Sequence, residues 1–173
     1  MLDHTFDDWK SRAAALQFRN QAFINGKFVD AASGKTFQSI NPATDAVLAD
    51  VAECDAEDVD RAVKSARKAF EAGSWSRAEP GHRKAVMLKL ADLIRENLEE
   101  MALLDSLDMG KLITDAVTVD APGSAHFFQW YAEAIDKIYD EVAPTGPGDL
   151  ALVRRVPLGV VGAVTPWNFP LDM

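Results

Sequence analysis

The sequence has one cysteine, no long apolar run and no excess of basic residues, and each of these absences excludes a class of protein. A single cysteine, Cys54, rules out an intrachain disulfide. No apolar run approaches the roughly 20 residues that a membrane-spanning helix needs. Lysine and arginine together number 18 against 27 acidic residues, and the resulting net charge of −9 argues against a nucleic-acid or anionic-membrane partner.

Metal-ligating and nucleotide-binding signatures are also scarce. The three histidines, His4, His82 and His126, do not have the spacing of metal ligands. Gly159 and Gly162 do not complete a Gly-x-Gly-x-x-Gly fingerprint. The acidic start of the chain has neither the basic end nor the apolar core of a signal peptide, so we expect a cytoplasmic protein. The length of 173 residues and the hydrophobic content of 48% are those of an ordinary globular domain.

Periodicity and turn residues predict a chain that alternates short strands with longer helices. Asp55 is a typical N-cap and Gly73 a typical helix stop, so a helix is expected between them. Pro80 suits the first turn of a second long helix that extends towards Gly110. Other expected elements are helices at 7–19 and 115–139, the latter broken or redirected by Pro122, a hairpin of strands 22–29 and 35–40, a half-exposed strand at 150–156 and a buried strand at 158–165.

The end of that last strand is the most informative part of the chain. Pro166 stops the apolar run, and Trp167 and Asn168 follow at once. Ligands of open α/β sheets bind beyond the carboxyl ends of such strands, so Asn168 is expected at the rim of a ligand site. Its side-chain amide could donate to an oxygen that gains negative charge in a reaction, or it could satisfy the backbone of a turn.

The sequence Pro-Trp-Asn-Phe-Pro at 166–170, after a Gly-Val-Val-Gly-Ala-Val strand, resembles the NAD(P)-dependent aldehyde dehydrogenase superfamily. The segments 23–28 and 41–44 resemble the family's amino-terminal hairpin and the turn after it, and 105–111 and 155–160 resemble later segments, all in the same order and at roughly the same spacing. The stretch 130–137 is most similar to the members that oxidise aminoaldehydes, among them the gamma-glutamyl-aminobutyraldehyde dehydrogenases.

The resemblance implies an α/β fold, the amino-terminal part of the family's cofactor-binding domain, with an incomplete doubly wound sheet. Residues 1–143 would form its hairpin and helices, 144–157 an oligomerisation arm, and 158–173 the first strand of the dinucleotide fold with its motif. The implied reaction is oxidation of an aldehyde to a carboxylic acid with reduction of NAD or NADP, in a homo-oligomer.

The resemblance also implies roles for single residues. Asn168 would stabilise the oxyanion of a thiohemiacetal, and Phe169 would line the substrate tunnel unless it is simply a core aromatic. The cofactor would contact Val164, Thr165, Pro166 and Trp167. Asp108, with backbone carbonyls near Ser39 and Ile40, would hold a monovalent cation, as oxygen-only ligation suits a hard ion; the alternative is a solvated helix-end aspartate.

The family's nucleophilic cysteine and general-base glutamate lie beyond the motif, outside these 173 residues. Cys54 stands beside acidic residues that suppress its thiolate, so it is not expected to replace the nucleophile. We therefore expect the chain alone to be inactive and to bind NAD poorly. Two alternatives remain: a truncated interaction protein that docks on full-length subunits through 150–157, and a product with no role. Asp172 departs from the family, which usually has an apolar residue there, and suggests an altered carboxyl end.

Overall fold

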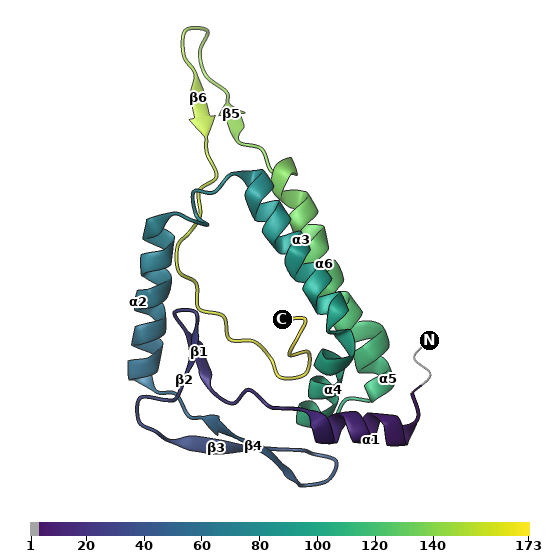
Figure 1. Cartoon of the computed structure of the whole chain (residues 1–173). Coiled ribbons are helices and arrows are strands. Elements are labelled where there is room, and N and C mark those ends of the chain that lie inside the picture. Colours follow the sequence, from purple (N-terminus) through teal and green to yellow (C-terminus); the bar gives the residue numbers. More distant parts are fainter. Residues whose placement is uncertain (1–3) are drawn as a thin grey trace.

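The computed structural model describes residues 4–173 as a group of helices with three separate two-stranded antiparallel sheets (Figure 1). The helices are α1 (Phe6–Ala15), α2 (Ala56–Ala72), α3 (Pro80–Glu96), α4 (Leu98–Met109), α5 (Ile113–Asp115), the π-helix η1 (Ala116–Asp120), α6 (Ala121–Ala134) and the 3-10 helix η2 (Ile135–Lys137). The strands are β1 (Ala22–Ile24), β2 (Lys27–Val29), β3 (Thr36–Ile40), β4 (Val47–Ala52), β5 (Glu141–Ala143) and β6 (Ala151–Val153).

Helix α2 begins and ends at the residues that its sequence predicts. The Asp55 carboxylate accepts a hydrogen bond from the backbone N–H of Glu57, and the Asp58 carboxylate reaches back to the N–H of Asp55. Gly73 ends the helix in the left-handed conformation, with φ of 81°. Asp58 is buried and also accepts from the N–H of Ala32 at 3.0 Å, so the same side chain ties the start of α2 to the loop after β2.

The helix expected from Pro80 towards Gly110 is instead two helices that meet at Asn97. The Asn97 side-chain amide donates to the carbonyl of Leu93 at 2.8 Å, and its backbone leaves the helical region with φ of −112° and ψ of 21°. Asparagine can offer the backbone such a local alternative to the helix, which explains the break.

The helix expected at 115–139 consists of four shorter pieces, α5, η1, α6 and η2. The N–H of Ala121 donates to the carbonyl of Ala116, the spacing of a π turn, immediately before Pro122. Proline has no N–H to donate, and here it occupies the first turn of α6, where none is required. The predicted break or change of direction at Pro122 is therefore confirmed. It takes the form of a change from π-helix to α-helix, and the helix is not interrupted.

The predicted pairing of strands 22–29 and 35–40 is wrong. β1 pairs with β2 around Asn25 and Gly26, which both have positive φ (54° and 75°), as in a tight two-residue hairpin turn. β3 pairs with β4, which the sequence analysis did not predict, and the register shifts between Ser39 and Ile40. The Asn-Gly pair was the available signal for the first hairpin.

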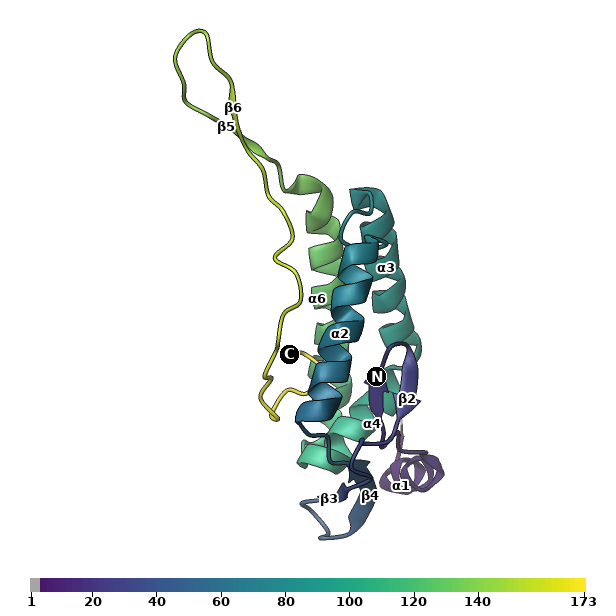
Figure 2. The same cartoon turned by 90° about the vertical axis from the view of Figure 1, so that its left-hand side faces the viewer.

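The core lies where α3, α4, η1 and α6 meet, and it is built mainly from alanine. α3 and α6 run side by side along most of their length (Figures 1 and 2). Small side chains let these helices approach closely, because packed interiors leave few voids. The most deeply buried apolar residues are Ala91, Ile94, Ala102, Ala116, Ala121, Ala125 and Ala132.

The segment 158–165, expected to be a buried strand, is neither a strand nor buried in this structure. It forms no ladder with any of residues 4–173, and the side chains of Leu158 and Val164 are almost fully exposed. A strand needs a neighbour that pairs its N–H and C=O groups, and the described chain offers none here. In Figure 1 this yellow segment descends between α2 and the α3–α6 pair.

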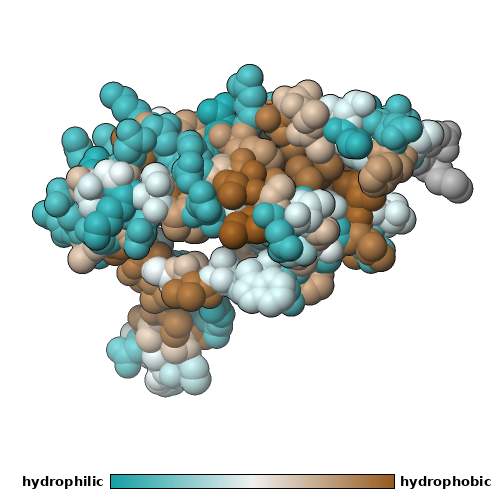
Figure 3. Space-filling model, turned by 90° about the horizontal axis from the view of Figure 1, so that it is seen from below, coloured by the Kyte–Doolittle hydropathy of each residue, from teal (hydrophilic) through white to brown (hydrophobic). Residues whose placement is uncertain are grey.

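The strand expected at 150–156 is shorter, β6, and it pairs with β5 across the predicted loop. Together they form a two-stranded arm that projects away from the helices (Figure 2). Figure 3 shows the end of the molecule away from this arm. Apolar side chains are exposed near the centre of that face.

We expect the 173-residue chain to self-associate because of its exposed carboxyl-terminal segment. Val161, Val164 and Trp167 are each more than two-thirds exposed, and extended apolar backbone with open N–H and C=O groups pairs readily with another copy. Size-exclusion chromatography with light scattering should show dimers or larger species for residues 1–173 and fewer of them for residues 1–157. A clean monomer at high micromolar concentration, equally soluble in both forms, would contradict this.

Candidate functional site

The predicted site residue Asn168 lies on a turn that is anchored to the helical core just after it. Residues 167–172 form consecutive turns, and the N–H of Met173 donates to the carbonyl of Phe169 at 3.2 Å. Leu171 packs against the buried cluster of Ala102, Ala116, Val117 and Ala121. Asn168 itself is exposed, and none of residues 4–173 forms a hydrogen bond with its amide. The turn is anchored, and the exposed amide of Asn168 is available to a ligand.

Lys111 provides a second anchor for this turn. Its ammonium nitrogen lies 3.8 Å from the centroid of the Phe169 ring, a cation–π contact, and forms an ion pair with the carboxylate of Asp120. The side chains of Lys111 and Asp120 are only 15% and 3% exposed, so both charges are largely removed from water and depend on each other. Phe169 therefore rests on a buried ion pair rather than on a purely apolar surface.

Asp172 forms the third anchor, in a hydrogen bond between its carboxylate and the buried hydroxyl of Ser124 on α6. Asp172 therefore has a specific partner in the core, and the altered carboxyl end suggested by the sequence stays a prediction. It also lines a pocket of about 570 Å³ between the turn and α6, here called the aromatic pocket. Its lining includes Phe127, Phe128 and Tyr131 on α6 together with Phe169.

The four residues predicted to contact the cofactor precede this turn as an exposed stretch. Val164 is fully exposed and Trp167 is 76% exposed, and Thr165 and Pro166 are exposed as well. They form one continuous surface that ends in the planar ring of Trp167. No part of residues 4–173 faces this surface to complete a cofactor site.

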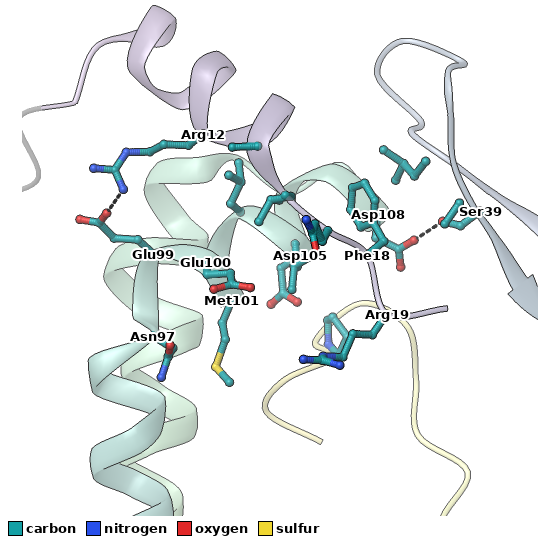
Figure 4. Close-up of a pocket in the computed structure, with 18 of the residues that line it drawn as sticks. Arg12, Phe18, Arg19, Ser39, Asn97, Glu99, Glu100, Met101, Asp105 and Asp108 are labelled. Atoms are coloured by element: carbon teal, nitrogen blue, oxygen red, sulfur yellow. Dashed lines mark hydrogen bonds and ion pairs between the residues drawn. The ribbon is translucent and has the colours of Figure 1, made fainter. Parts of the chain in front are cut away.

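Two of the predicted cation-site residues, Ser39 and Asp108, meet in a second and larger pocket, of about 960 Å³, between α1, α4 and the β3–β4 sheet (Figure 4). The hydroxyl of Ser39 donates to the carboxylate of Asp108, at 2.5 Å. Ile40 follows at the register shift, and its side chain is exposed. No group of three or more histidine, cysteine or acidic side chains within residues 4–173 is arranged to hold a metal ion.

Asp105 lines the same pocket, and its pKa is shifted more than that of any other acid that lines it. Burial raises its pKa to about 6, and the negative charge of Asp120 adds to this, while Lys111 opposes it. One of its carboxylate oxygens is buried without a hydrogen-bond partner. A protonated Asp105 relieves both the desolvation and the repulsion from Asp120.

Replacing Asp105 with asparagine should change how stability depends on pH. Because the pKa of Asp105 in the folded chain lies above its ordinary value of 3.8, the wild type should lose stability as pH rises from about 4 through about 6. The variant should lack this loss, which is at most about 3 kcal/mol for such a pKa shift, and should therefore be more stable than the wild type at pH 7.5. Urea unfolding between pH 4.5 and 7.5 measures it, with Asp92→Asn as an exposed control. Parallel curves for the wild type and Asp105→Asn would contradict the assignment.

Cys54 and the three histidines line neither of the two pockets. Cys54 is exposed, and desolvation together with the charges of Asp58 and Asp55 raises the pKa of its thiol, which disfavours the thiolate. His82 is exposed, and His126 is an exposed residue of α6. His4 differs, because it packs edge-on against Trp9 and lies 3.1 Å from a carboxylate oxygen of Glu99.

The sequence analysis missed Lys111, Asp120, Asp105 and Ser124, which support the turn. Lys111 was visible only as part of the segment 105–111 that resembles the family. Asp120 and Ser124 lie in a helical stretch whose break into a π turn the periodicity does not reveal, so the local sequence carried no signal that they are buried.

Comparison with known proteins identifies relatives over nearly the whole chain. A model of the aldehyde dehydrogenase family matches residues 28–173. An aminoacetaldehyde dehydrogenase of Pseudomonas aeruginosa is 52% identical over 96% of this chain and 34% of its own length. The NADP/NAD-dependent aldehyde dehydrogenase PuuC of Escherichia coli is 48% identical over 97% of this chain and 34% of its own length. The chain thus spans about a third of the length of these curated relatives.

Solved structures show the same fold. The indole-3-acetaldehyde dehydrogenase AldA of P. syringae, in a complex with NAD+ and IAA, matches 98% of this chain and 34% of its own length, with a TM-score of 0.96 and 54% identity. No helix within residues 4–173 is long and apolar enough to span a membrane.

Proposed function

The chain belongs to the aldehyde dehydrogenase family, and we propose that it is part of an enzyme that oxidises an aldehyde to a carboxylic acid with NAD or NADP. The observation that carries this proposal is the exposed amide of Asn168 on an anchored turn. A family match over residues 28–173 supports it. One relative is named for an aminoaldehyde, aminoacetaldehyde, and we propose this substrate class for the enzyme.

Asn168 has the chemistry needed to stabilise the reacting oxygen. When a nucleophile adds to the aldehyde carbon, the carbonyl oxygen gains a negative charge, and the Asn168 N–H can donate to it. The three anchors, at Lys111, Leu171 and Ser124, hold the turn in place before the reaction, so little reorganisation is needed as the charge develops. The nucleophile and the base that activates water are supplied by parts of the enzyme other than these residues.

Residues 164–167 fit one side of a dinucleotide. They are exposed, mostly apolar, and end in an indole that offers a flat face, which suits contact with a planar heterocycle. When bound, NAD(P)+ supplies the acceptor for the hydride that leaves the aldehyde carbon. The contribution of this chain is to present that wall next to Asn168, so that cofactor and reacting oxygen lie close together.

The assay that tests the proposal uses an enzyme of the relatives' full length that carries these residues. With NAD+ or NADP+ and a panel of aliphatic, aromatic and amino aldehydes, reduced cofactor should accumulate and equal the carboxylic acid formed. Absence of turnover with every aldehyde, for a protein that is folded by circular dichroism, would contradict the proposed function.

We propose that the β5–β6 arm contacts another subunit. β6 pairs only with β5 among the described strands, and Val142, Leu152 and Val153 are all more than half exposed. An open strand edge with apolar side chains can extend the sheet of a second copy or of a full-length subunit.

The second candidate function, an interaction protein that docks through 150–157, rests on the same edge. We also propose that the protein is cytoplasmic, as its sequence predicts.

We also propose that Asp108, with carbonyls near Ser39 and Ile40, holds a monovalent cation. The carboxylate of Asp108 is exposed to the larger pocket, and its hydrogen bond with Ser39 joins α4 to β3. A bound potassium or sodium ion should stabilise the chain, because only the folded state brings these oxygens together. Melting curves in potassium, sodium and tetramethylammonium chloride at equal ionic strength test this. The stabilisation should vanish in Asp108→Asn, and equal melting temperatures in all three salts would exclude the site.

A further inference from the structure

The carboxylate of Asp172 is an unusual group in the aromatic pocket. The other lining side chains on α6 and the turn are mostly apolar: Phe127, Phe128, Tyr131, Phe169 and Leu171. Asp172 is the one carboxylate among the residues that line this pocket. A partly buried charge in such surroundings is costly unless it has a partner. Ser124 supplies a single hydroxyl to one oxygen of the carboxylate, which leaves the other oxygen able to accept from a second donor.

The surroundings of the pocket also carry a net negative charge. Lys111 is the nearest cation that contacts the turn, and it is already paired with Asp120. Asp105 lies close enough that the charges of both Asp120 and Asp172 act on it, after burial, to raise its pKa. Three carboxylates therefore share one ammonium group, so a further cation would be attracted to this region.

The rings of the pocket favour the same kind of ligand. An ammonium group is stabilised by the faces of aromatic rings as well as by a carboxylate, and the two effects reinforce each other when water is partly excluded. Four aromatic side chains and one carboxylate border a space of about 570 Å³, which is large enough for a short aliphatic chain. A carboxylate beside these rings favours a cationic ligand over a neutral one of the same size.

We propose that Asp172 is a specificity residue that binds the ammonium group of a cationic aldehyde in the aromatic pocket. This inference rests on the proposed function, because it assigns a substrate class to the same site. The aldehyde end of the substrate would point towards Asn168, which precedes Phe169 on the same turn, and the ammonium end towards Asp172 and Ser124.

The test compares two aldehydes of equal size in the full-length enzyme. 3-Aminopropanal carries an ammonium group at neutral pH, and butanal has a methyl group in its place. In Asp172→Asn the ratio of kcat/KM for 3-aminopropanal to that for butanal should fall about 10-fold, through KM rather than kcat. Asparagine keeps the shape of the side chain and can still accept from Ser124, so the variant should fold. Asp92→Asn, an exposed control on α3, should leave the ratio unchanged.

A second variant separates charge from anchoring. Ser124→Ala removes the hydrogen bond to Asp172 and keeps the charge, so it should retain the preference for 3-aminopropanal even if turnover of both aldehydes changes. Added salt should reduce the preference in the wild type and have little effect in Asp172→Asn. An unchanged ratio in Asp172→Asn would overturn the inference and leave Asp172 as a structural anchor only.

A binding measurement keeps the inference independent of turnover. Saturation-transfer NMR of the same protein with propylammonium chloride and with 1-propanol should show contact with propylammonium that is lost in Asp172→Asn, and no such change for 1-propanol. If no aldehyde is oxidised but this pattern holds, the proposed function fails and the cation preference of the pocket stands. If aldehydes are oxidised but propylammonium binds equally to both proteins, the cation preference fails and the proposed function stands.

Discussion

In a full-length enzyme that carries this chain, we expect Asn168→Ala to lower kcat by about 100- to 1,000-fold with little change in KM. The hydrogen bond from the Asn168 amide forms fully only when the carbonyl oxygen becomes an oxyanion, so its loss falls on the transition state and not on substrate binding. Asn168 makes no hydrogen bond with the rest of the described chain, so the substitution should not disturb the fold.

Steady-state kinetics with a saturating cofactor measure this effect. Asn168→Asp is the informative companion, because it keeps the size of the side chain and replaces the N–H donor with a negative charge; its kcat should fall at least as far. Asn20→Ala is a control, since that amide donates to the carbonyl of Asp50 far from the turn in sequence. A change confined to KM would instead make Asn168 a residue of ground-state binding.

We expect the 173-residue chain by itself to show no NAD(P)-dependent oxidation of any aldehyde. Its one thiol, Cys54, is exposed, and its raised pKa keeps it protonated at neutral pH. Binding of NAD+ should be weaker than millimolar, because residues 164–167 offer one wall of a site that needs two and a pyrophosphate contact. Absorbance of the reduced cofactor and calorimetry measure the two effects.

The control for this experiment is Cys54→Ala. A turnover that disappears in this variant would make Cys54 the nucleophile and overturn the assignment of Asn168 to a site completed by other parts of the enzyme. A micromolar dissociation constant for NAD+ would show that the chain builds a complete cofactor site by itself.

Local signals in the sequence predicted those elements whose ends are fixed by local chemistry. Helix α2 is the clearest case, because Asp55 and Gly73 mark its ends by capping interactions that involve only neighbouring residues. The same reasoning failed at Asn97, where a side chain that caps its own helix end sits inside an otherwise regular apolar pattern. It also failed at Asn25 and Gly26, because the stretch 22–29 was interpreted as one strand despite its turn residues.

The strand predicted at 158–165 shows why composition alone does not decide secondary structure. Its apolar residues are typical of a strand buried on both faces, but a strand exists only where neighbouring strands accept and donate its hydrogen bonds. None of the described residues does so, and the segment is extended and exposed. Agreement between the pattern and the structure would require a sheet that residues 4–173 do not form among themselves.

The candidate site was predictable in its motif and not in its support. The motif at 166–170 identifies Asn168 and Phe169 from the sequence alone. The contact between Ser39 and Asp108, which are 69 positions apart, was predicted only by the resemblance to a family. Lys111, Asp120 and Ser124 act through contacts between distant segments, which no periodicity encodes. The structure was needed to show that the turn rests on charged and polar partners.

The π turn at Ala116–Asp120 sets the angular phase of the helix that follows it. Each residue advances an α-helix by about 100°, and a π turn holds one residue more than an α turn that spans nearly the same rotation. A change that made this turn regular α-helix without removing a residue would therefore rotate α6 by about 100° relative to α4. Ser124 would then face away from Asp172, and Phe128 would leave the aromatic pocket, although every side chain involved would still be present. The type of this turn is therefore as much a determinant of the site as the identity of its residues.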